Sequence, residues 1–146
     1  MWKAVSVEVE TTMAFRTRQV NKALFENYLR KARENLETAR ECLNAERWNA
    51  AVVNAVHCGI NACDALTVFM IGVRHAGERH EDAISLLQTL NLPKAVLTNK
   101  GRQLSRLLEI KNAAEYEERL MSQGEARESV RDAERFLQWI EESLRR

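Results

Sequence analysis

Lys111 occupies a position at which a helix would be expected to bury an apolar side chain. Leu104, Leu107 and Leu108 precede it at spacings of three and four residues, which places all four side chains on one face of one helix. A lysine within such a stripe must extend to solvent, pair with a carboxylate or take part in chemistry. Glu115 lies one helical turn further on and can provide the carboxylate. The pattern therefore indicates either a structural ion pair at the margin of a core or a degenerate functional site between helices.

A second polar feature lies in the most apolar part of the chain. Four polar side chains within residues 48–71 recur at steps of three, four and three residues and form one stripe along a helix: Asn54, His57, Asn61 and Asp64. Such a stripe is either an exposed strip between two flanking helices or a polar seam that meets another helix or another subunit. In the second case Asp64, like Glu115, is a candidate partner for Lys111, whose side chain we expect to face inward or toward a subunit interface.

Composition and charge exclude several classes of protein. The chain has 146 residues, of which 45% are hydrophobic and 29% charged, as is typical of one globular domain. A net charge of +1 provides no overall field that would attract nucleic acid. The polar stripe interrupts the apolar stretch, which favours a buried helix over a membrane span, and the N-terminus lacks the apolar centre of an export signal. We expect a cytoplasmic protein that does not contact a membrane.

The common catalytic motifs do not occur in the sequence. Phosphate-binding glycine loops, the HExxH zinc motif and the GxSxG nucleophile motif are missing, and the carboxylates are dispersed over helix faces. Cys42, Cys58 and Cys63 fall within helical patterns and are interpreted as reduced thiols, without the cysteine and histidine spacing of a metal site. We therefore expect no metal and no cofactor.

Five helices are predicted from the periodicity of apolar residues and from the turns between them. Their approximate ranges are 21–45, 48–71, 80–90, 94–120 and 125–145. Residues 99–101 are the expected place of a kink or interruption in the fourth helix, and Ser122 and Glu125 form a capping-box pattern before the fifth. Short connections between long amphipathic helices predict an all-α fold, an antiparallel up-and-down four-helix bundle with one additional short helix.

The N-terminal residues 1–20 are expected to form an arm or tail outside a single bundle domain that spans residues 21–146. Val5, Val7 and Val9 alternate with polar residues as in a strand, which would be a docked arm, an edge that pairs with a second copy, or a tail. The first helix then has a basic outer face, opposed only by Glu26, to which six side chains contribute: Arg16, Arg18, Lys22, Arg30, Lys31 and Arg33. This face is either solvated or in contact with nucleic acid.

Four segments occur in an order and spacing that are found in one protein family. They are the alanine-rich helix start at residues 47–51, the segment 61–66, the glycine-bearing loop and helix start at 77–83, and the segment 111–116. The stretch from about Ala23 to Ile140 thereby resembles the HEPN domain proteins of bacteria and archaea. The resemblance implies a four-helix bundle with a fifth element, usually dimeric. Many such proteins are RNases, others accompany minimal nucleotidyltransferases in toxin–antitoxin pairs, and some are catalytically silent.

The chain departs from the RNase motif that the resemblance implies, an arginine and a polar residue followed four to six residues later by histidine. Lys111 stands at the arginine position and Asn112 at the polar position, while Tyr116, Glu117 and Glu118 stand where histidine is expected. Metal-independent cleavage of RNA needs groups that accept and donate a proton near neutral pH, as histidine does. Tyrosine, with an unperturbed pKa of about 10, does so poorly. Lysine lacks the bidentate fork of arginine.

The preferred interpretation is a HEPN-like interaction module without catalytic activity. It would form a homodimer and bind a protein partner, such as a nucleotidyltransferase or an antitoxin, or a nucleotide. The alternative is a metal-independent endoribonuclease of the toxin type, whose modified site would consist of Lys111, Asn112 and Tyr116. A plain helical adaptor is a third interpretation. The residues expected to contribute to binding are Asn54, His57, Asn61, Asp64, Arg79, His80, Lys111 and Glu115.

Overall fold

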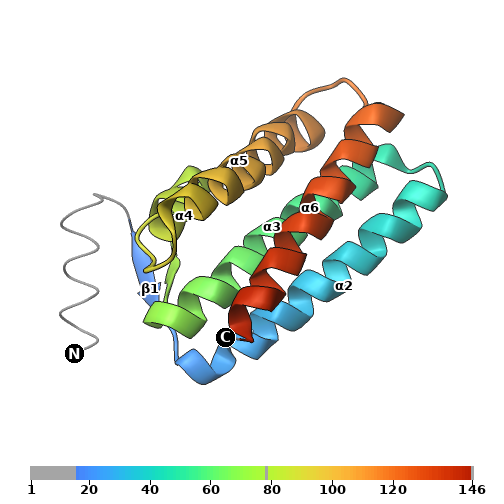
Figure 1. The fold of residues 1–146 in the computed structure, drawn as a ribbon. Coiled ribbons are helices and arrows are strands. Elements are labelled where there is room, and N and C mark those ends of the chain that lie inside the picture. Colours follow the sequence, from blue (N-terminus) through green and yellow to red (C-terminus); the bar gives the residue numbers. More distant parts are fainter. Residues whose placement is uncertain (1–15, 78, 146) are drawn as a thin grey trace.

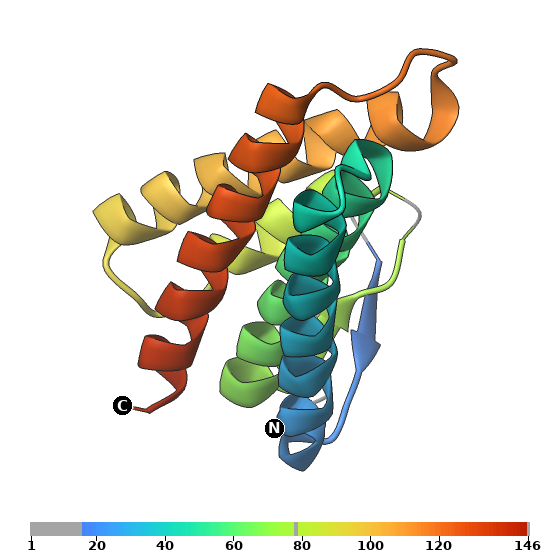
Figure 2. The same cartoon turned by 90° about the vertical axis from the view of Figure 1, so that its right-hand side faces the viewer.

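The computed structural model describes residues 16–77 and 79–145, and their fold is a helical bundle with a small sheet at its side (Figure 1). The elements in chain order are β1 (Thr17–Gln19), a short 3-10 helix η1 (Lys22–Leu24), α2 (Phe25–Asn44), α3 (Trp48–Ile71), β2 (Val73–His75), α4 (Glu81–Leu87), α5 (Lys94–Tyr116) and α6 (Gln123–Leu144). The predicted all-α fold, four long helices with one short additional helix, is therefore confirmed. Figure 2 shows that α5 is inclined to the other three long helices.

The helix α3 is the centre of the bundle. It packs against α2, α5 and α6, and its side chains Ala51, Val52, Ala55 and Val56 have no exposed surface. By length and composition α3 could cross a membrane, but 72% of its apolar window is buried inside the bundle. That degree of burial is what the core helix of a helical domain requires, because a helix that is apolar on all sides needs neighbours on all sides.

Two helices cover α3 with regular apolar seams. The seam of α2 buries Leu29, Ala32, Leu36 and Ala39, which are the positions expected from the steps of three and four residues. The start of α6 is fixed by a reciprocal capping box, in which Glu125 N donates to Ser122 Oγ and Ser122 N donates to the Glu125 carboxylate. The capping box thereby gives hydrogen-bond acceptors to the backbone N–H groups of Ser122 and Glu125, which have no acceptor within the helix itself.

The fourth long helix differs from its prediction in two ways. α5 is continuous through residues 99–101, and it ends at Tyr116 rather than near residue 120. Gly101 is buried, and a Cβ there would lie 2.5 Å from Nε2 of Gln88. This glycine therefore leaves room for the Gln88 side chain, whose Nε2 donates to the Leu97 carbonyl of α5 at 2.9 Å, instead of interrupting the helix.

A two-stranded sheet was not predicted. β1 and β2 pair antiparallel, with Thr17 opposite His75, Arg18 opposite Arg74 and Gln19 opposite Val73. Segments of three residues are too short for their periodicity to be recognised. Residues 17–19 of the expected arm are thus paired with the segment that follows α3. The valine pattern at residues 5–9 lies outside the described residues.

α3 lies close to α5 at Gly59, where a Cβ would lie 2.8 Å from Cδ1 of Leu107 and 3.3 Å from Cδ1 of Leu104. Gly59→Ala should lower the free energy of unfolding measured by urea denaturation. Overpacking a core costs about 1–3 kcal/mol. The gain in helix propensity is about 1 kcal/mol. Gly124→Ala in α6 is the matched control, because its nearest neighbour lies 3.9 Å away. Equal stabilisation of both variants would contradict this account of the contact.

Candidate functional site

The ammonium group of Lys111 is held inside the domain by Glu115. Lys111 is only 9% exposed, on the α5 face that also buries Leu104, Leu107 and Leu108. Its Nζ donates a hydrogen bond to Oε2 of Glu115 at 2.8 Å. The hydrogen bond and charge of Glu115 raise the pKa of Lys111 above 10.5, although burial opposes the shift. Lys111 thus faces inward, and of its two expected partners the structure selects Glu115.

Glu115 also reaches the central helix. Its other carboxylate oxygen, Oε1, lies 3.8 Å from Nε2 of His57 on α3. The ring centroid of Tyr116 lies 5.3 Å from the Lys111 ammonium, within the range of a cation–π contact. The Glu115 carboxylate therefore contacts both Lys111 on α5 and His57 in the polar stripe of α3. Tyr116, at a position where the RNase motif has histidine, lies beside Lys111.

The three histidines of the sequence gather around this pair. His75 in β2 is 4% exposed, and its Nε2 lies 3.3 Å from Nδ1 of His80 at the start of α4. Oδ1 of Asp64 on α3 lies 3.5 Å from Nδ1 of His75, which has no hydrogen-bond partner among the described residues. The result is a chain of titratable groups from Asp64 through His75 to His80, which starts on α3 and ends at α4.

His80 connects this chain to Lys111. Its pKa is lowered below 6.5, first by burial and then by the positive charges of His75, Lys111 and His57, while Glu81 raises it. These charges act on His80 only because the folded chain brings α3, β2, α4 and α5 together. The cluster formed by Asp64, His57, His75, His80, Lys111, Glu115 and Tyr116 is called the histidine–lysine cluster below.

Asn49 fixes the end of α5 that carries this cluster. Its Nδ2 donates to the carbonyl of Ala114 at 3.4 Å, and its Oδ1 accepts from the backbone N–H of Met121 at 2.8 Å. The amide side chain at the start of α3 therefore clamps the last turn of α5 and the connection to α6. It positions the residues of the cluster without touching their charged groups.

The structure separates the residues that were expected to bind together. The four residues of the polar stripe do not meet in one seam: Asn54 donates to the Ala50 carbonyl of its own helix, and Asn61 to Asn35 of α2. Only His57 and Asp64 belong to the cluster. Arg79 and Asn112 are exposed. His75 belongs to the cluster but was read as part of a charged connection, because a three-residue strand gives no sign that its side chain is buried.

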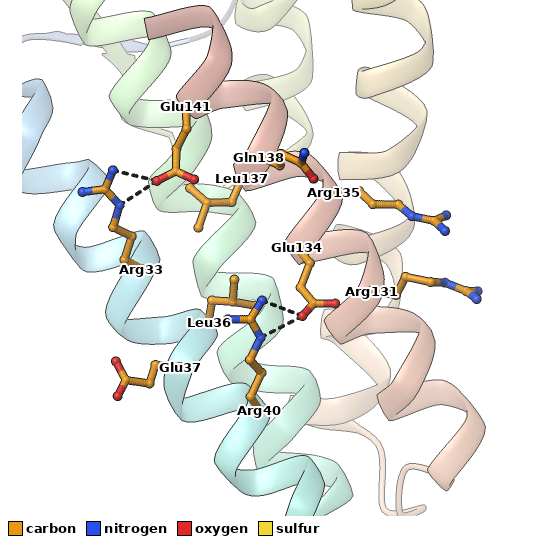
Figure 3. Close-up of a pocket in the computed structure, with 10 residues that line it drawn as sticks. All are labelled: Arg33, Leu36, Glu37, Arg40, Arg131, Glu134, Arg135, Leu137, Gln138 and Glu141. Atoms are coloured by element: carbon orange, nitrogen blue, oxygen red, sulfur yellow. Dashed lines mark hydrogen bonds and ion pairs between the residues drawn. The ribbon is translucent and has the colours of Figure 1, made fainter. Parts of the chain in front are cut away.

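A charged groove between α2 and α6 is a second candidate and is structural in character (Figure 3). Its volume is about 790 Å³. Arg33 pairs with Glu141 and Arg40 with Glu134, each at 2.6 Å, so the arginines of α2 are satisfied by carboxylates of α6. Figure 3 shows Arg131 and Arg135 pointing away from these pairs. Burial raises the pKa of the nearby Cys58 to about 12, so its thiol is protonated and not a nucleophile.

The fold and the cluster define a helical bundle in which α3, α5, β2 and the start of α4 contribute the polar residues of the cluster. Comparison with protein families gives a match to the HEPN domain over residues 25–143 of the chain. The chain therefore belongs to the HEPN domain family, and the resemblance seen in the sequence is confirmed. Among curated proteins no sequence matches this chain. Within residues 16–77 and 79–145, no three cysteine, histidine or acidic side chains lie together as metal ligands would.

The lowered pKa of His80 predicts a pH dependence of stability. Between the folded pKa and 6.5 the unfolded chain binds more protons than the folded chain. The free energy of unfolding should therefore fall as the pH drops below 6.5 and level off below the folded pKa. Urea denaturation between about pH 5 and pH 7.5 should show this loss in the wild type and less of it in His80→Gln. Arg79→Gln is the control and should keep the wild-type profile. A constant difference between wild type and His80→Gln would contradict the prediction.

Proposed function

We propose that this HEPN domain is a non-catalytic interaction module that acts as a homodimer. The observation that carries the proposal is the Lys111–Glu115 contact of 2.8 Å. A cation at the arginine position of the motif serves an RNase only if it is available to a phosphate group. Here an internal carboxylate already neutralises it, and a phosphate would have to displace Glu115 against charge repulsion.

The surface beside this site supports an interaction role. Tyr116 and Leu120 are 74% and 80% exposed, at the end of α5 and just beyond it. Large apolar side chains exposed next to a polar cluster are typical of surfaces that another protein covers. We infer that a second copy of the chain covers them, since the family resemblance implies a dimer in which two motifs meet. A nucleotidyltransferase, an antitoxin or a nucleotide would then bind the dimer, as the resemblance also suggests.

A second candidate function, a metal-independent endoribonuclease, is favoured by the histidines. His57 lies 3.8 Å from the carboxylate that holds Lys111, and the charges of Lys111 and His57 act on His80. The acid and base that α5 lacks would then come from α3 and α4. A lowered pKa keeps His80 neutral near pH 7, as a general base requires. The engagement of Lys111 by Glu115 is the reason that we rank this function second.

The dimer should dissociate when its proposed apolar contact is removed. We expect light scattering at micromolar concentration to give twice the chain mass of 16.8 kDa for the wild type. Tyr116→Ala combined with Leu120→Asp should give the mass of one chain. Leu24→Asp is the matched control, because Leu24 is another exposed apolar residue, 45% exposed, at the start of α2. A wild type with the mass of one chain would overturn the proposal.

Purified protein should leave mixed RNA intact in the presence of a chelator. Lys111→Arg combined with Tyr116→His should introduce cleavage, because residue 116 lies beside Lys111 and gaining a positioned acid–base group typically changes a rate by about 10²–10⁴-fold. Lys111→Arg with Glu109→His is the control, because Glu109 is an exposed residue of α5 that precedes the motif. Cleavage by the wild type that is lost in both His57→Ala and His80→Ala would instead establish the second candidate.

A further inference from the structure

A pocket beside the two-stranded sheet lies apart from the proposed interaction surface. Its volume is about 540 Å³, within the usual range of about 300–1,000 Å³ for small-molecule sites. The lining residues come from β1, the start of α2, α3 and β2: Arg18, Gln19, Val20, Asn21, Leu24, Tyr28, Lys31, Asn61, Asp64 and Arg74. The basic outer face at the chain's start and half of the polar stripe of α3 therefore meet here.

The pocket gathers cations that have no carboxylate partner in the described part of the chain. Arg18, Lys31 and Arg74 line it, and the ion pairs found among residues 16–77 and 79–145 include none of the three. Arg18 and Arg74 are direct partners in the ladder of β1 and β2, so their side chains leave the sheet on the same face. Like charges placed opposite each other destabilise a strand pair. A bound anion would turn this repulsion into attraction.

Arg74 has an unsatisfied donor. Its Nη1 donates to the carbonyl of His75 at 3.0 Å, but its Nε is buried and has no hydrogen-bond partner. A buried donor without an acceptor costs about 1–3 kcal/mol, so native proteins keep few of them. An anionic oxygen in the pocket would provide the missing acceptor and would use the guanidinium fork.

The remaining lining residues set the character of the ligand. Asp64 is the single carboxylate among the described lining residues, and it is 5% exposed and faces His75 at 3.5 Å. Three cations against one carboxylate leave a charge of 3 − 1 = +2 at the pocket, which suits a dianion. Tyr28 and Asn61 add neutral polar groups. Val20 and Leu24, the latter 45% exposed, add an apolar wall.

We propose that this pocket binds the phosphate group of a small phosphomonoester, with an organic part that packs on the apolar wall. A monoester carries close to two negative charges at neutral pH, and arginine forms two parallel hydrogen bonds to such a group. The volume leaves room for more than a phosphate ion. The proposal does not depend on the function proposed above, because it uses neither Lys111 nor the end of α5.

The test is titration calorimetry of the full chain with phenyl phosphate, inorganic phosphate and phenol. We expect saturable binding of phenyl phosphate, weaker binding of inorganic phosphate, and none of phenol. Lys31→Gln and Arg74→Gln should each weaken the binding of phenyl phosphate by about tenfold or more. Arg30→Gln is the matched control, because Arg30 is a neighbouring arginine of α2 that pairs with Glu34 and does not line the pocket.

Arg18→Gln separates loss of binding from loss of folding. It should weaken binding while the unfolding midpoint of the ligand-free protein stays equal or rises, because it removes the repulsion from Arg74. The site would be overturned if Arg30→Gln lost as much affinity for phenyl phosphate as the pocket variants. Binding of phenol, or no saturable binding of phenyl phosphate to the wild type, would also overturn it. Equal affinity for inorganic phosphate and phenyl phosphate would overturn the organic part. Tighter binding of an RNA without a terminal phosphate would assign the cations to a nucleic-acid surface and overturn the proposal.

Discussion

The close approach of α3 and α5 at Gly59 is the constraint on which the arrangement of the domain depends. A Cβ there would lie 2.8 Å from Cδ1 of Leu107, so a larger residue would force the end of this leucine side chain to shift. Because the two helices lie close together, His57 of α3 comes within 3.8 Å of Glu115, and the carboxylate that neutralises Lys111 also faces the central helix. The contact of Glu115 with His57 places polar residues of α5 and α3 in one site.

The basic side chains of the domain fall into two groups, those that pair with a carboxylate and those that do not pair with one in the described part of the chain. On α5 and in the groove between α2 and α6, basic groups pair with carboxylates, as Lys111 does with Glu115 at 2.8 Å and Arg40 with Glu134 at 2.6 Å. The pair of Arg40 and Glu134 joins α2 to α6, whereas the pair of Lys111 and Glu115 lies within α5. In both, the charge of the basic group is neutralised inside the protein. Beside the sheet, Arg18 and Arg74 stand opposite each other without a carboxylate partner in the described part of the chain. A structural cation differs from one that can bind a ligand in having a carboxylate partner. The volumes of the groove and of the pocket do not make this distinction.

A histidine chain links these two regions. Asp64 lines the pocket beside the sheet and also lies 3.5 Å from His75, which in turn lies 3.3 Å from His80. The positive charge of Lys111 contributes to the lowered pKa of His80. The short strand β2 is the element common to both regions, since Arg74 and His75 are adjacent in it and point to opposite faces of the sheet. This explains why a strand of only three residues matters to the chemistry of a helical protein.

The sequence by itself determined the helices and their seams, because apolar periodicity extends over many turns and each turn adds to the same signal. The resemblance to the family came from the order and spacing of four segments, and the family match over residues 25–143 confirmed it. The sequence also predicted that Lys111 would face inward with Asp64 or Glu115 as its partner, and the structure shows Glu115, one turn away. Only the tertiary structure decided which polar residues share a site. Within the polar stripe of α3, His57 contacts α5, Asp64 contacts β2 and Asn61 contacts α2, because three different elements surround this helix. The pairing of β1 with β2 likewise joins residues more than fifty positions apart, and no local spacing in the sequence records a contact of that range.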